Sequence, residues 1–169
     1  MTALERWIEE RLAGRAVALV GVGNRLRGDD GAGPALADRL RRPGAARGEG
    51  AARWRVLDAG TVPENFLGPL LEAAPDVVLF ADAVDHGGAA GEWVVAAPDA
   101  LEPRDGGTHA PSLRLVAGLL AAHGIECWLL GVQPGPRAFG EGLTRGVAAA
   151  VETMARALEA APVAEASRA

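Results

Sequence analysis

Short runs of apolar residues alternate along this chain with segments in which apolar residues recur three and four positions apart. The consecutive apolar runs predict strands that are buried in a sheet, at 16–21, 54–57, 76–81 and 125–132. A further strand, at the edge of the sheet, is predicted at 92–96. Helical periodicity predicts the helices between them: 32–42, 63–74, 112–123 and 143–160. This order is typical of an α/β fold, a three-layer sandwich in which helices flank a mostly parallel, twisted sheet of about five strands.

The two ends of the chain and one internal stretch lie outside this alternation. Leu4, Trp7, Ile8 and Leu12 have helical spacing and predict a leading helix within residues 1–14. Residues 43–53 are rich in Gly, Ala and Arg and predict a flexible surface loop, and the tail at 162–169 is expected to fray. We therefore expect a single domain over 1–169, with its core at 16–160.

Composition narrows the classes of function. The net charge of −5 and the pI near 5.2 argue against a nucleic-acid-binding protein. Every basic residue is Arg, which excludes a Schiff-base Lys or a P-loop Lys. Cys127 is alone, so no intrachain disulfide can form. The charged N-terminus does not resemble a signal peptide, and no apolar run is long enough for a membrane helix. We expect a cytoplasmic monomer that does not bind membranes.

Polar residues that can carry chemistry follow the predicted strands. Residues 21–33 (GVGNRLRGDDGAG) follow the first strand, Asp58 follows the second, and Asp82 and Asp85 follow the third. His109 precedes a predicted helix. Ligands of open α/β sheets bind beyond the carboxyl ends of the strands, so these side chains are expected to meet at one edge. Two carboxylates and one imidazole fit a divalent-metal site with open positions.

The glycine-rich loop has a competing interpretation as a dinucleotide site. Gly21 and Gly23 match the first and third positions of that fingerprint, but the sixth is Leu26. Asp29 and Asp30 would also repel a pyrophosphate. The glycines can equally serve only a tight turn, which Asn24 would brace through the backbone.

Purely structural roles are also open for the other candidates. Asp29 or Asp30 can cap the helix that begins at Ala32, Asp82 can cap a turn, and His109 can be an exposed loop residue. Cys127 lies inside a predicted strand, which favours a buried structural thiol over a nucleophile.

Five segments together resemble the hydrogenase maturation endopeptidases, in their order and approximate spacing. They are GVGNRLRGDDGAGP (21–34), LDAGTVPEN (57–65), ADAVDHG (81–87), GTHAPSL (107–113) and LGVQP (130–134). The resemblance extends over about residues 16–158.

The resemblance implies an aspartic-type endopeptidase that trims the C-terminal extension of a [NiFe] hydrogenase large-subunit precursor already loaded with nickel. It also implies that Asp30, Asp82 and His109 bind the metal, with Asp30 and Asp82 as the catalytic residues. The nickel would be presented by the substrate, without an organic cofactor. Two other functions stay open: a non-catalytic module that recognises a metal centre, and a nucleotide- or small-molecule-binding α/β enzyme.

Overall fold

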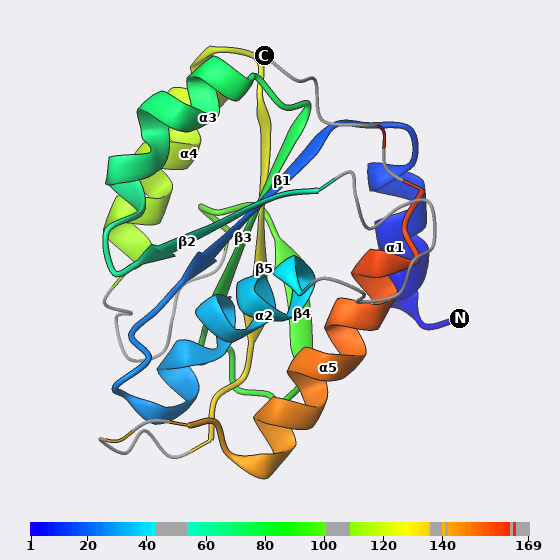
Figure 1. Cartoon of the computed structure of the whole chain (residues 1–169), viewed down its shortest axis with the longest axis vertical. Helices are drawn as coiled ribbons and strands as arrows, with labels where there is room; N and C mark the ends of the chain where they lie inside the picture. The colour runs from blue at the N-terminus through cyan, green and yellow to red at the C-terminus, as the bar shows by residue number, and fades with distance from the viewer. Residues whose placement is uncertain (43–53, 101–108, 136–139, 141, 163, 165–169) are drawn as a thin grey trace.

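A five-stranded sheet in the order β2-β1-β3-β5-β4 forms the centre of the protein, seen in a computed structural model of the chain (Figure 1). The structure describes residues 1–42, 54–100, 109–135, 140, 142–162 and 164. Four strands run parallel: β1 (Val17–Val22), β2 (Arg55–Gly60), β3 (Val77–Ala83) and β5 (Glu126–Val132). The edge strand β4 (Trp93–Ala96) pairs antiparallel with β5. The predicted α/β class with a mostly parallel sheet is confirmed.

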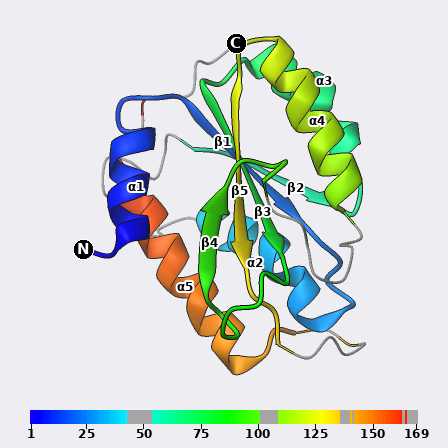
Figure 2. The same cartoon turned by 180° about the vertical axis from the view of Figure 1, so that it is seen from behind.

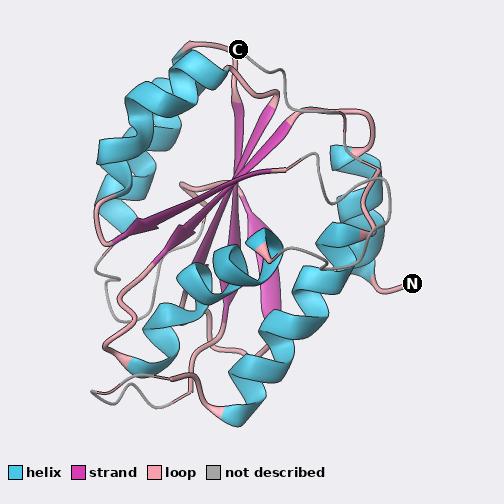
Figure 3. Ribbon diagram, in the orientation of Figure 1, coloured by secondary structure: helices cyan, strands magenta, loops and turns pink. Residues whose placement is uncertain are grey.

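Helices cover both faces of the sheet, which gives the three layers (Figures 2 and 3). One face carries α1 (Ala3–Leu12), α2 (Ala32–Arg41) and α5 (Arg145–Glu159), and the other carries α3 (Leu67–Ala73) and α4 (Ala110–Ala122). Alternate side chains of strand β1 pack against the helices on the two faces of the sheet. Val17 and Leu19 pack with α1, α2 and α5, whereas Ala18 and Val20 pack with α3 and α4. Successive side chains of a strand point to opposite faces, so the sheet has two separate cores.

Most predicted elements are present, with shifted ends. The predicted helix at 63–74 is divided into a 3₁₀ turn, η3 (Pro63–Phe66), and α3. The helix expected at 112–123 begins earlier, at Ala110, with Pro111 in its first turn. A further 3₁₀ turn, η1 (Gly28–Gly31), precedes α2 and was not predicted. Single 3₁₀ turns are too short to show a period in the sequence.

The leading helix is present. Helix α1 begins at a capping box between Thr2 and Glu5 and buries Ile8 and Leu12. At the start of the tail, Gly14 N donates to Pro162 O at 2.7 Å and Ala164 N donates to Arg15 O at 2.8 Å. The frayed tail stays a prediction. The predicted loop at 43–53 and residues 165–169 lie outside the described residues.

None of the helices in the described part of the chain has the length and apolar character needed to cross a membrane.

Glycines allow α2 to lie directly against the sheet. A Cβ at Gly33 would lie 2.1 Å from the carbonyl oxygen of Ala81 on β3 and 2.4 Å from that of Val22 on β1. A Cβ at Gly21 would lie 2.5 Å from Gly33 O. Real Cβ atoms do not approach oxygen this closely, so Gly is needed on both sides of this contact. The contact also places η1, directly before α2, at the carboxyl edge of the sheet.

We predict opposite effects for two Gly→Ala substitutions. Gly33→Ala is expected to lower the free energy of unfolding by roughly 1–3 kcal/mol, because the added methyl group overpacks a backbone contact. Gly118→Ala, where a Cβ meets nothing within 4 Å in the middle of α4, is expected to raise it by about 0.5–1 kcal/mol. Urea unfolding of both variants tests this, and wild-type stability for Gly33→Ala would contradict the close approach.

Candidate functional site

Asp30 reaches the carboxyl edge of the sheet from η1. The preceding loop turns sharply at Gly23, where φ is +143° and a Cβ would lie 1.8 Å from Asp30 O. Asn24 Oδ1 accepts a hydrogen bond from Leu26 N at 2.9 Å, which confirms the predicted brace of this turn. Asn24 N in turn donates to Asp30 Oδ2 at 2.9 Å. The glycine loop thus fixes the direction of the Asp30 carboxylate, which is 5% exposed.

Asp82 reaches the same place from β3. It shares a face of the strand with Phe80, two residues earlier, and that face is covered by α4. The residue is buried, at 4% exposure, and Oδ1 has no hydrogen-bond partner among the residues that the structure describes. Buried polar atoms are nearly always paired, so an orphaned carboxylate oxygen points to a ligand.

His109 lies where α4 begins. It is the N-cap residue of that helix, and its carbonyl oxygen accepts a hydrogen bond from Leu113 N at 3.0 Å. The ring is 6% exposed, and Nδ1 lies 3.4 Å from Asp82 Oδ2. The alternative of an exposed loop histidine is therefore wrong. The start of α4, rather than a free loop, brings this imidazole to the carboxylates.

The three side chains form one buried group. One candidate ligand atom from each of Asp30, Asp82 and His109 lies within 4.8 Å of the other two. Ligand atoms bound to one ion at about 2.1 Å lie at most about 4.2 Å apart. Side-chain shifts of about 1 Å would therefore bring all three onto a single ion. The donor set of two oxygens and one nitrogen fits a divalent transition metal.

The group is electrostatically costly when no cation is bound. Burial raises the pKa of the Asp82 carboxyl to about 6. The charge of Asp30 acts in the same direction, whereas His109 acts to lower this pKa. Two carboxylates in a desolvated space repel each other, and a cation would remove that repulsion.

Asp29, beside Asp30, binds two distant segments of the chain and does not cap a helix. Neither acid caps α2, whose N-cap is Gly31 without any side-chain hydrogen bond. Asp29 is fully buried and its carboxylate accepts from Gly135 N at 2.8 Å, Thr144 N at 2.7 Å and Thr144 Oγ1 at 2.9 Å. Both partners are more than 100 residues away in the sequence, so the sequence pattern held no signal for this contact.

The other acids at this edge are bound to protein groups. Asp58 accepts from Arg25 Nη2 at 2.6 Å, so it lies in an ion pair. Asp85 Oδ1 accepts from Gln133 Nε2 at 3.1 Å. Gln133 belongs to the segment LGVQP (130–134), and its buried side chain contacts the turn that follows β3.

The glycine-rich loop is used for internal packing. The positions where a Cβ would collide face the protein's own backbone: Gly21 faces Gly33 O, and Gly23 faces Asp30 O. In a dinucleotide loop the second glycine of the fingerprint lets the backbone approach the pyrophosphate; here Gly23, at that position, lies against Asp30 O instead. This packing, with two buried acids in the loop, argues against the nucleotide-binding alternative.

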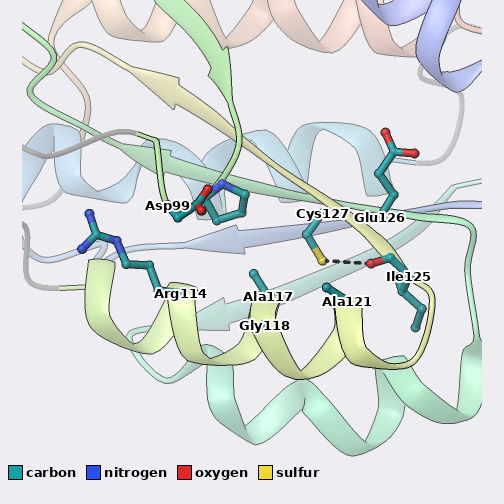
Figure 4. A pocket seen from close by; sticks show the side chains of 9 residues that line it. Asp99, Arg114, Ala117, Gly118, Ala121, Ile125, Glu126 and Cys127 are labelled. Carbon is teal, nitrogen blue, oxygen red and sulfur yellow. Dashed lines mark hydrogen bonds between the residues drawn. The ribbon is translucent and has the colours of Figure 1, made fainter.

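A separate cavity of about 440 Å³ lies between α4 and the beginning of β5 (Figure 4). Its lining includes Gly118, Ile125 and Cys127. Burial raises the pKa of the Cys127 thiol to about 12, and Sγ lies 3.7 Å from Ile125 O. The thiol is therefore protonated at neutral pH, which is consistent with a structural cysteine.

Fold and site together define a small α/β protein with a buried Asp-Asp-His group at the carboxyl edge of its sheet. The profile of the HycI hydrogenase maturation proteases matches residues 34–161. The hydrogenase 3 maturation protease of Escherichia coli K12 is 37% identical over 142 residues, which cover 83% of this chain and 87% of that protein. The chain belongs to the hydrogenase maturation protease family, and it is an endopeptidase.

Solved structures agree with this assignment. The [NiFe] hydrogenase maturation protease HycI from Thermococcus kodakarensis superimposes with a TM-score of 0.73 at 28% identity, over 94% of this chain and 99% of that one. The endopeptidase HycI from Escherichia coli gives a TM-score of 0.70 at 32% identity, over 90% and 97% of the two chains. The expected resemblance to this family is confirmed, and the rival of a non-catalytic binding module is set aside.

The charge of Asp82 leads to a prediction about stability and pH. The folded-state pKa, about 6, lies above the ordinary value of 3.8, so wild-type stability falls as pH rises through this window. Without metal, Asp82→Asn is therefore expected to melt at an equal or higher temperature than wild type at pH 7.5, by a few degrees at most. Its advantage should shrink as pH falls from about 6 to about 4.

Thermal melting in EDTA across this pH range provides the measurement. Asp76→Asn is the matched control, because Asp76 is an exposed carboxylate at the opposite edge that accepts from Ala16 N at 2.8 Å. An Asp82→Asn variant that melts early at every pH would mean that Asp82 has a structural role.

Proposed function

We propose that this endopeptidase removes the C-terminal extension from the large-subunit precursor of a [NiFe] hydrogenase after nickel has been inserted. Family membership supports the class of substrate, since relatives are named as [NiFe] hydrogenase and hydrogenase 3 maturation proteases. The observation that carries the proposal is the buried group of Asp30, Asp82 and His109, in which Asp82 Oδ1 has no partner within the described part of the chain.

In this proposal Asp30, Asp82 and His109 are ligands to the nickel of the substrate. Two carboxylate oxygens and one imidazole nitrogen are an incomplete set for a transition metal and bind it only modestly on their own. Nickel already held by thiolates of the precursor would supply the remaining ligands. The protease would then dock productively only on a loaded precursor, which makes nickel part of the recognised substrate.

Cleavage requires a base near the scissile bond, and we assign that role to the carboxylate of Asp30 or Asp82. The carboxylate accepts a proton from a water molecule while the water oxygen attacks the peptide carbonyl carbon. The C–N bond then breaks, and the proton passes to the departing amine nitrogen. The mature large subunit leaves with a new carboxylate, and the extension leaves with a new amino terminus.

Nickel dependence of processing is the first expected outcome. Purified protease is incubated with nickel-loaded and nickel-free precursor, and the shortened subunit is followed on a denaturing gel. Only the loaded precursor should be cut, because the protease supplies too few ligands to recruit the metal itself. Equal cleavage of both forms would refute the nickel check while leaving the endopeptidase activity intact.

Single amide substitutions then test the site. Asp30→Asn and Asp82→Asn are each expected to slow processing of loaded precursor by roughly 10²–10⁴-fold, since each removes a ligand charge and a possible base. Asp76→Asn, the same chemical change at the opposite edge of the sheet, should process at the wild-type rate. If Asp30→Asn and Asp82→Asn also cut normally, the two carboxylates are structural and the site lies elsewhere.

A further inference from the structure

Residues 133–135, directly after β5, form a connection between the turn that follows Asp82 and the 3₁₀ turn η1, which carries Asp30. At one end of this connection, Gln133 contacts the turn that follows β3. Its Oε1 accepts hydrogen bonds from the main-chain N–H groups of His86, Gly87 and Gly88 at 2.9, 2.9 and 3.2 Å. Three N–H donors around one atom require the amide oxygen there, which sets the orientation of the amide.

The rest of Gln133 is also fully engaged. Nε2 donates to Asp85 Oδ1 at 3.1 Å and to Pro134 O at 3.4 Å. The main-chain N donates to Glu92 O at 2.9 Å, and the main-chain O accepts from Gly91 N at 2.8 Å. Such a residue cannot shift without breaking several hydrogen bonds. The turn at 85–88, which begins three residues after Asp82, is therefore fixed to the end of β5.

At the other end, Gly135 contacts the segment of Asp30. Gly135 N donates to Asp29 Oδ2 at 2.8 Å, and Asp29 also holds Thr144 through two hydrogen bonds. Asp29 is fully buried and directly precedes Asp30. A charged carboxylate with three donors forms strong hydrogen bonds, so η1 is held firmly on this side.

The connection between the two ends is short and stiff. Gln133 and Gly135 are separated only by Pro134, which is buried and whose ring fixes φ. Two peptide units span at most about 7.6 Å between their Cα atoms. We infer that Gln133 and Asp29 are positioning residues, which set the separation of the Asp30 and Asp82 carboxylates through this connection. The inference rests on the proposed function of those two carboxylates.

Stability alone would not require this arrangement. Asp76 also binds a main-chain N–H across the sheet, that of Ala16 at 2.8 Å, but at the edge away from the site. Gln133 instead holds the turn that begins three residues after Asp82, and Asp29 directly precedes Asp30. A misplacement of about 1 Å at reacting groups can cost about 10²-fold in rate, so loosening this connection should affect chemistry at temperatures where the protein is fully folded.

The test uses Gln133→Leu, which leaves three N–H groups without an acceptor, and Asp29→Asn, which weakens the contacts to Gly135 and Thr144. The kcat for nickel-loaded precursor is expected to fall roughly 10–100-fold in each, with KM near the wild-type value. Broadening of the His109 ring NMR signals by Ni²⁺ gives a second readout. It should need roughly 10–100-fold more Ni²⁺ than in wild type.

Milder and control variants keep the result interpretable. Thr144→Val removes only the hydroxyl bond to Asp29, so this variant should fold and show a smaller loss. Leu120→Ala, at a buried position on α4, lowers stability without touching the connection. Its melting temperature should fall while kcat and the Ni²⁺ midpoint stay at wild-type values.

Two failures are distinguishable. If Gln133→Leu and Asp29→Asn lose only melting temperature, as Leu120→Ala does, the connection is purely structural and the inference is wrong. If Asp30→Asn and Asp82→Asn keep the wild-type Ni²⁺ midpoint and cleavage rate, or if Ni²⁺ does not broaden wild-type His109, the proposed ligand set is wrong instead.

Discussion

Two carboxylates and an imidazole share a buried space at the carboxyl edge of the sheet, and most of the local structure serves to hold them there. Candidate ligand atoms of Asp30, Asp82 and His109 lie within 4.8 Å of one another, and all three side chains are almost fully buried. Like charges in such a place repel unless a cation or hydrogen bonds compensate. Asn24 N supports one carboxylate and His109 the other, whereas Asp82 Oδ1 is left open.

The position of this group depends on a contact between backbones. Gly21 on β1 and Gly33 on α2 meet without any side chain between them, and Gly33 also lies against Ala81 O on β3. Helix α2 therefore begins directly on the sheet, and η1 in front of it carries Asp30 toward the end of β3. Residues with a Cβ would push the helix outward and open the carboxylate pair. The glycines of this loop are thus needed for the site although they contact no ligand.

Under the proposed function, an incomplete ligand set suits a protease that inspects a metal centre. A closed site with four protein ligands would keep its own ion, as structural metal sites do. Three ligands at the rim of an open α/β sheet leave room for the ligands of a partner. In that proposal the same carboxylates accept a proton during hydrolysis, so one small group would serve both recognition of the loaded precursor and its cleavage.

The sequence by itself determined the α/β class, because buried strands and amphipathic helices each have a period that local residues impose. Its motifs also indicated the family, and they singled out the three residues that the structure brings together. Only the tertiary structure decided that β4 joins the sheet antiparallel to β5. It also decided that Asp29 binds Gly135 and Thr144 while its neighbour Asp30 faces Asp82. The two adjacent aspartates look alike in a local pattern, and their roles differ because partners more than 100 residues away bind one of them.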